Sequence, residues 1–402
     1  MTARERGNVG SRGKLWDVKH IACFILLAAS TGLAQKLTLE AADNPAAPGS
    51  LQPNWALAAD GSALLSWVEP AGNAAYTLRY AVRRANGWSE ARTIAAGRKL
   101  WRHPAEMPEL VSLSDGTLLA HWVEKGKESS DAEDIYISSS KDGVRWTEPA
   151  IAHHDHSPEQ HGLASMAASG PREASLFWLQ ALKGEDGPVS LMRTIVSADG
   201  KEVREEDLDS DVCSCCPTSV VKTAKGLLVA YRDHTPQDIR DIAVLRFENG
   251  KWLPSKILHA DNWKINACPV NAASAAARDN RVAVAWYTEA DDNPRVQVMM
   301  SSDSGATFGK PTMISTSKDA VGYAATALNQ DGSAIVSWLE EGEKSAHVFA
   351  RVVSPAGTAS PVVTVGEGSR DNLGYPKLLR TGTETWIAWG NTKIGVKTAR
   401  LK

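Results

Sequence analysis

Long hydrophobic stretches are missing from the chain after residue 33, and so are basic tracts. No segment beyond that point is apolar for long enough to cross a bilayer. Asp and Glu (47) slightly outnumber Lys and Arg (44). A mildly acidic chain without a basic patch argues against nucleic acid as a partner.

Phenylalanine and tyrosine are also scarce, with five and seven copies against 14 tryptophans. Tryptophan at regular spacing is frequent in repeating β-architectures, so this bias prompts a search for a period. The hydrophobic share of 43% and the charged share of 23% are ordinary for a globular protein with a large core.

Residues 1–34 have the order of parts found in a secretory signal peptide. Basic side chains such as Arg4, Arg6 and Lys14 come first, and the short apolar run 21–33 follows. Small residues end the segment, with a cut expected before Gln35. An N-terminal membrane anchor is the alternative. We therefore expect an exported protein, periplasmic or secreted, whose residues 35–402 form one domain, without a transmembrane segment and monomeric.

One pattern recurs along the rest of the chain: a turn, often Asp-Gly, then an alternating strand that ends in an aromatic residue and frequently an acid. The aromatic residues recur every 51 to 56 positions, at Trp67, Trp122, Trp178, Tyr231, Trp286, Trp338 and Trp389. Three further short strands accompany most copies. Four strands per period of roughly 50 residues predict an all-β propeller of seven blades.

The two ends of the repeat array complement each other. The last copy has only three strands, and an unattached strand at 36–41 precedes the first copy. Pairing that strand with the last blade would complete the seventh blade and cover both free edges. We therefore expect a ring closed by the N-terminal strand.

Two turns carry a family resemblance. Ser301-Ser302-Asp303-Ser304-Gly305-Ala306-Thr307-Phe308 looks like the Asp-box turn of sialidases and related BNR-repeat propellers, and 140–146 is the same turn one residue shorter. Its Asp and Ser side chains are suited to bonding their own turn backbone. With the segments 212–218 and 268–271 and His161-Gly162, the chain resembles exported bacterial sialidase-like proteins of largely unassigned function. Sialidases have six blades, which makes a six-bladed ring the alternative.

The mouth of the channel is the expected site, because inner strands begin there and second strands end there. The catalytic candidates are His161, Glu124, Arg232, Asp233 and Arg240, and the binding candidates are Asn271, Glu69, Glu289 and Tyr323. The acids would suit glycoside hydrolysis, which uses paired carboxyl groups, but they could equally face water. The charged residues Arg232, Asp233, Arg240 and Asp241 could instead pair with one another.

Four cysteines remain after the signal peptide: Cys213, Cys215, Cys216 and Cys268. An even number in an exported chain first suggests disulfides. Copper or zinc is the alternative, because thiols near the histidines 153, 154, 156 and 161 would suit either ion. A reactive thiol is the third reading, and no cofactor is firmly predicted.

The resemblance to sialidases implies three arginines that bind the substrate carboxylate. It also implies a Tyr/Glu pair that supplies the nucleophile and an Asp that acts as the acid. Candidate arginines are Arg102, Arg232, Arg240, Arg295 and Arg370. The Arg-Ile-Pro motif expected near the start is absent, and Gln52-Pro53-Asn54-Trp55 stands there instead. We favour a glycosidase-like, carbohydrate-active protein over two alternatives. The first alternative is a non-catalytic propeller with structural disulfides, which binds a glycan, another small polar ligand or a protein. The second alternative is an exported Cys/His metalloprotein.

Overall fold

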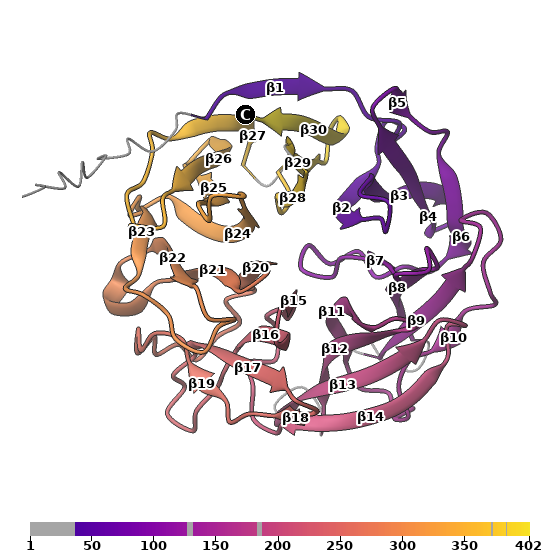
Figure 1. The fold of residues 1–402 in the computed structure, drawn as a ribbon, viewed down its shortest axis with the longest axis horizontal. Coiled ribbons are helices and arrows are strands. Elements are labelled where there is room, and N and C mark those ends of the chain that lie inside the picture. The colour runs from indigo at the N-terminus through magenta and orange to yellow at the C-terminus, as the bar shows by residue number, and fades with distance from the viewer. Residues whose placement is uncertain (1–36, 127–131, 183–186, 371–372, 383) are drawn as a thin grey trace, which may run out of the picture. The chain divides into compact units, whose positions relative to one another are not determined.

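Seven antiparallel sheets stand side by side around a central channel (Figure 1). The computed structural model describes residues 37–402 except 127–131, 183–186, 371–372 and 383. The expected signal peptide lies outside these residues. The predicted seven-bladed, all-β propeller is confirmed, and the six-bladed alternative is wrong. The described part contains one short helix, η1 (Ala290–Asp292), and no helix in it is long and apolar enough to span a membrane.

Each of the first three blades is a meander that starts at the channel. Blade 1 comprises β2 (Leu51–Leu57), β3 (Ala63–Gly72) and β4 (Ala75–Arg84), with β5 (Gly87–Trp88) and β6 (Arg92–Arg98) both paired to β4. Blade 2 comprises β7 (Glu109–Ser112), β8 (Leu118–Lys125), β9 (Glu133–Ser140) and β10 (Ala150–Ile151). Blade 3 comprises β11 (His161–Gly170), β12 (Glu173–Ala181), β13 (Val189–Ser197) and β14 (Glu202–Asp209).

The remaining blades repeat this order. Blade 4 comprises β15 (Ser219–Thr223), β16 (Gly226–Arg232) and β17 (Ile242–Glu248), with β18 (Lys251–Trp252) and β19 (Lys256–Ile257) both paired to β17. Blade 5 comprises β20 (Ser274–Arg278), β21 (Arg281–Thr288), β22 (Arg295–Ser301) and β23 (Thr312–Ser315). Blade 6 comprises β24 (Ala320–Leu328), β25 (Ala334–Glu341), β26 (Ser345–Val353) and β27 (Val363–Ser369).

The seventh blade contains both ends of the propeller. Its strands β28 (Lys377–Thr381), β29 (Glu384–Asn391) and β30 (Gly395–Leu401) are completed by β1 (Leu39–Ala42). Leu39 lies opposite Leu401, and the backbones of Thr38 and Lys402 exchange hydrogen bonds of 2.8 and 3.0 Å. The Glu40 carboxylate also pairs with Arg400 and Lys402. The expected closure of the ring by the N-terminal strand is confirmed.

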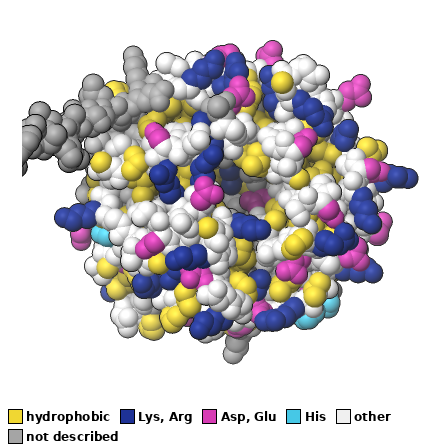
Figure 2. All heavy atoms as spheres, viewed as in Figure 1, with side chains coloured by type: hydrophobic (Ala, Val, Ile, Leu, Met, Phe, Trp, Pro, Cys, Tyr) yellow, Lys and Arg dark blue, Asp and Glu magenta, His cyan; other side chains and the backbone are white. Residues whose placement is uncertain are grey.

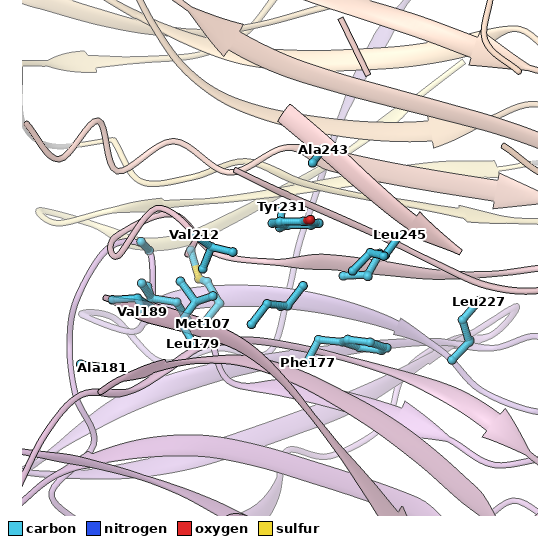
Figure 3. Packing of buried hydrophobic residues seen from close by; sticks show 14 of the residues in the cluster. Met107, Phe177, Leu179, Ala181, Val189, Val212, Leu227, Tyr231, Ala243 and Leu245 are labelled. Carbon is cyan, nitrogen blue, oxygen red and sulfur yellow. The ribbon is translucent and has the colours of Figure 1, made fainter. Parts of the chain in front are cut away.

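Seven apolar clusters fill the seven interfaces between neighbouring blades. Between blades 3 and 4, Phe177 and Leu179 of β12 face Leu227, Tyr231 and Leu245 of β16 and β17 (Figure 3). Burial of such side chains stabilises each interface by about 1.5–3 kcal/mol per large residue. Every blade is therefore held from both sides, and none is a separate folding unit.

The recurring aromatic residues are buried in these interfaces, and six of them place their polar atom on a defined acceptor. Trp67, Trp122 and Trp338 each donate their indole N–H to the glutamate two residues later, Glu69, Glu124 and Glu340, at 2.7 Å. Trp178, Tyr231 and Trp286 donate to Thr194, Asp209 and Asp261 at 3.0, 2.6 and 2.8 Å. A buried N–H or O–H without a partner is costly, which accounts for the acid that follows so many of the aromatic residues.

The two Asp-box turns join the third and fourth strands of blades 5 and 2. The Asp303 carboxylate accepts hydrogen bonds from the Thr307 backbone at 2.9 Å and from the Thr307 hydroxyl at 2.6 Å, while Ser301 Oγ accepts from Gly305 N–H at 2.9 Å. Asp142 binds the backbone of the shorter turn in the same way. The turns therefore stabilise hairpins, as the sequence predicted.

Substitution of Glu69 tests its role as an acceptor for Trp67. Glu69→Leu removes the acceptor and should lower the free energy of unfolding by about 1–3 kcal/mol, whereas Glu69→Gln keeps a side-chain oxygen and should cost less. Urea unfolding of the two variants and the parent measures the difference. Equal losses in both variants would contradict this role.

Candidate functional site

A pocket of about 250 Å³ opens at the channel mouth where the starts of the inner strands of blades 2 to 5 converge. It is lined by an aromatic pair, Trp101 and His103, by Glu133 and Glu159, and by the thiols of Cys215 and Cys268. A hollow of about 170 Å³ beside it shares His103 and carries Arg102 and Gln52. The channel below is a cavity of about 230 Å³ lined by all seven inner strands. Figure 2 shows the hollow at the centre of the ring, with acidic and basic side chains around it.

The aromatic side of this mouth pocket is a stacked pair. The rings of Trp101 and His103 lie 6.0 Å apart at 15°, and Lys125 Nζ lies 3.6 Å from the centre of the Trp101 ring. Burial, together with the charge of Lys125, lowers the pKa of His103, so its imidazole is neutral at pH 7. The pair therefore offers a ligand a flat apolar face with polar edges.

Two carboxyl groups converge behind this surface at Gly162. A Cβ atom at Gly162 would lie 2.7 Å from Glu106 Oε2 and 3.2 Å from Glu133 Oε2, so a glycine is needed for the close approach. Burial, and then the charge of Glu133, raises the pKa of Glu106 well above its usual value. Glu106 also accepts the backbone N–H of Leu163. Glu106 therefore takes up a proton more readily than an exposed glutamate, and it does so directly behind a carboxyl group that lines the pocket.

Some of the left-handed backbone of the described residues lies at the same end of the channel. Four non-glycine residues at or just before the starts of inner strands have left-handed φ values of 50°, 55°, 49° and 51°: Gln52, Leu163, Val270 and Tyr323. The strand registers shift beside three of them. Such conformations cost about 1–3 kcal/mol each and cluster at functional sites, which supports a binding role for the mouth.

His161, the expected catalytic histidine, is fully buried beneath this pocket. Its Nδ1 donates a hydrogen bond to the Glu133 carbonyl at 2.9 Å, and its ring stacks on His153 at 4.2 Å and packs against Trp178. Asp155 Oδ2 lies 3.6 Å from Nε2. The structure thus places His161 where it supports the backbone of Glu133, and a direct catalytic role stays a prediction.

Arg232 is only 2% exposed and bridges blades 4 and 5. Its guanidinium donates to the backbone carbonyls of Arg240, Asn271 and Tyr287 at 2.7, 3.2 and 2.9 Å. Arg240 in turn donates to the Ile265 carbonyl at 3.1 Å and to Cys213 Sγ at 3.3 Å. Neither guanidinium is directed into the mouth pocket by these bonds.

The expected ion pairs within the loop between β16 and β17 are not formed. The Asp241 carboxylate accepts the backbone N–H groups of Asn262 and Trp263 at 2.9 and 3.1 Å. No salt bridge joins Arg232 or Arg240 to Asp233 or Asp241, all four of which are described. Burial and the charge of Asp209 raise the pKa of Asp233 to about 6. The pairing prediction is therefore wrong, because backbone groups satisfy these side chains instead.

The remaining predicted residues do not come together in one pocket. Glu69 and Glu124 hold buried indoles, and Glu124 also pairs with Arg98. Asn271 accepts the Tyr323 N–H and donates to the Val321 carbonyl, both at 2.9 Å, so it joins blades 5 and 6. Glu289 is exposed and accepts the Tyr287 hydroxyl at 3.2 Å. Their binding roles stay predictions.

The five candidate arginines do not share a pocket either. Arg295 binds Asp261 at 3.1 Å, Arg102 lines the smaller hollow, and Arg370 is exposed. Arg232 and Arg240 are held as described above. The arrangement that would bind a sialic acid carboxylate is therefore not formed by these side chains.

Cysteines and histidines form two separate groups. One contains the sulfur atoms of Cys213, Cys215 and Cys216, and the other contains Asp134, His153 and His161. The single Cys/His cluster expected from the sequence is therefore wrong, since the two loops enter different blades. None of the four described cysteines, which include Cys268, is joined in a disulfide. A disulfide stays a prediction.

The residues that define the mouth pocket were not all accessible to sequence reasoning. Trp101, Glu106, Glu133 and Glu159 lie in loops or at strand ends outside the repeating pattern. Gly162 was the available signal, because a glycine beside a predicted inner strand indicates a close approach of other groups.

The ring of four-stranded meanders with Asp-box turns defines a sialidase-like β-propeller. The chain belongs to the BNR repeat-like domain family, whose model matches residues 72–386. No curated protein matched the sequence.

Two solved structures share the fold over nearly their whole length. A protein of unknown function from Dyadobacter fermentans is 14% identical, with 92% of this chain and 98% of that chain covered and a TM-score of 0.51. An ulvan lyase bound to a glucuronyl–rhamnose sulfate repeat is 11% identical, with 90% and 94% covered and a TM-score of 0.55. A third structure, of the NanB sialidase of Streptococcus pneumoniae, is 12% identical, with 85% of this chain and 83% of that chain covered and a TM-score of 0.47.

The buried His153 should make stability depend on pH. Its Nδ1 donates to the Asp155 carbonyl at 2.6 Å, its Nε2 accepts the Ile135 N–H at 3.2 Å, and burial lowers its pKa to about 3. Because the unfolded chain binds this proton below about pH 6.5, stability should fall on acidification from that pH towards 3, by about 1.4 kcal/mol per pH unit.

Urea unfolding at pH 7 and pH 5 tests this linkage. The parent should lose more stability between the two values than His153→Gln, whose amide cannot take up the proton. The same loss in both proteins would contradict the assignment.

Proposed function

We propose that the protein is a carbohydrate-active propeller that binds a glycan in the mouth pocket and acts on it as a glycosidase-like enzyme. The observation that carries the proposal is the convergence of Glu106 and Glu133 at Gly162, beside the Trp101–His103 surface. Sugar recognition needs acceptors for hydroxyl groups and a flat apolar face for the ring, and this pocket supplies both.

Acid–base chemistry on a glycosidic bond needs a carboxyl group that can exchange a proton with the ligand, and both groups here are largely buried. Glu133 lines the pocket and would contact the ligand, whereas Glu106 is 2% exposed and lies behind it. Glu106 would hold a proton next to Glu133, and His161 would fix the backbone of Glu133 through its carbonyl. Glu133 is accordingly the proposed catalytic residue, and Glu106 and His161 are positioning residues.

A non-catalytic glycan-binding propeller is the second candidate. Glu106 and Glu133 are only 2% and 7% exposed, so the pocket could bind a glycan without bringing either carboxyl group to the glycosidic bond. Sialic acids are disfavoured as ligands of this pocket, since its charged lining residues are the acids Glu133 and Glu159. A neutral glycan is the ligand class that the lining favours.

Binding and turnover of neutral polysaccharides and oligosaccharides test the proposal. Glu133→Gln should lower turnover by about 100- to 10,000-fold, as expected for loss of a general acid–base group. Trp101→Ala should weaken binding by up to about tenfold, because a stacked face is lost. The surface variant Glu148→Gln is the control and should match the parent.

The outcomes separate the candidates. Binding that Trp101→Ala weakens, without any product, supports the non-catalytic propeller. Turnover or binding that is indifferent to both pocket variants contradicts the mouth pocket as the site.

We also infer export to the periplasm or the medium, which the basic start and the apolar run 21–33 support. Mass spectrometry of the protein recovered from the exported fraction should find a mature N-terminus at Gln35. Recovery of the intact N-terminus from the membrane fraction would instead indicate an anchor.

A further inference from the structure

Three sulfur atoms converge in the tight turn that leads into the inner strand of blade 4. Cys213 Sγ lies 3.5 Å from Cys216 Sγ and 3.9 Å from Cys215 Sγ, and all three lie within 4.8 Å of one another. Cys213 and Cys216 are buried, whereas Cys215 is half-buried and reaches the wall of the mouth pocket.

The separation of 3.9 Å equals that of sulfur ligands that share one ion, and the separation of 3.5 Å is slightly shorter. With metal–sulfur bonds of about 2.3 Å, thiolates in trigonal or tetrahedral arrangements lie about 3.8–4.0 Å apart. A disulfide would bring one pair to about 2.05 Å and leave the third sulfur alone. The turn thus holds all three sulfur atoms close together, whereas a disulfide would join two of them and leave the third unbonded.

Donors and positive charge surround the three sulfurs. Arg240 Nη1 donates to Cys213 Sγ at 3.3 Å, and the Asn271 backbone N–H donates to Cys216 Sγ at 3.4 Å. The buried Arg232 forms no salt bridge with a described carboxylate, and its hydrogen bonds end on carbonyl oxygens. Outer-shell donors of this kind orient and stabilise metal ligands.

The charges balance for a univalent ion. Three thiolates around a +1 cation carry a net charge of −2, and Arg232 and Arg240 supply +2 around them.

We propose that Cys213, Cys215 and Cys216 bind one Cu(I) ion in a three-coordinate thiolate site. Soft thiolates select Cu(I) and zinc, but structural zinc sites take four ligands. Cys268 is exposed and lies outside the mutually close set of three, although its thiol makes a hydrogen bond with the thiol of Cys215. Among the described residues, no histidine belongs to this set of three sulfurs.

The site is independent of the proposed glycan chemistry, although Cys215 belongs to both surfaces. Copper binding is read from metal stoichiometry, and glycan binding from Trp101 and Glu133 variants. Failure of one proposal therefore leaves the other standing.

Anaerobic titration of the reduced mature protein with Cu(I), in competition with a chromogenic Cu(I) chelator, tests the site. The parent should retain one Cu(I) per chain. Cys213→Ser and Cys216→Ser should lose it, whereas the matched control Cys268→Ser should retain it. Arg240→Gln should keep the stoichiometry but weaken the affinity about 10- to 100-fold, as expected when an outer-shell partner is lost.

X-ray absorption of the copper-loaded parent decides the case if a buried-cysteine variant does not fold. Three sulfur neighbours at about 2.3 Å and no nitrogen support the proposal. Three outcomes would each overturn it. The parent could retain no copper, or Cys268→Ser could lose copper and Zn(II) displace it. The third outcome is a reduced-thiol count of zero in the protein as isolated.

Discussion

The antiparallel pairing of β1 with β30 is the constraint on which the rest of the molecule depends. It completes blade 7 with a strand from the other end of the chain and brings blades 7 and 1 into contact across their own apolar cluster. Once the ring is closed, every blade has two neighbours and the starts of the seven inner strands face one channel. The mouth pocket and the cysteine turn are both products of that convergence.

Within the closed ring, polar side chains divide into two groups. Those near the recurring aromatic residues satisfy buried indole and phenol groups, as Glu69 does for Trp67, and so belong to the packing of the blades. Those in the loops that enter the inner strands do not bind the recurring aromatic residues. Glu106, Val270 and the cysteine turn lie there, and Glu133 at the start of β9 and Leu163 within β11 lie at the same end of the channel. The architecture thus gathers these residues at one end of the channel.

The fold could be predicted because each blade buries one aromatic residue at the same place, so the spacing from Trp67 to Trp389 counts the blades. The site could not be predicted in the same way. Whether Glu124 faces a channel or an indole depends on side-chain direction at a strand end, which periodicity does not specify. The separation of His161 from Cys213 depends on the path of two loops. Gly162 alone indicated the meeting point of Glu106 and Glu133.

Amide hydrogen exchange of a chain that begins at residue 43, compared with one that begins at residue 37, tests most directly whether ring closure creates the mouth. Without β1, exchange should accelerate in β30 and in the loops that lead into β2, β11 and β15, because an unsupported blade 7 loosens the whole ring. Unchanged protection of the mouth loops, with loss confined to β30, would show that the mouth forms without closure and would contradict this account.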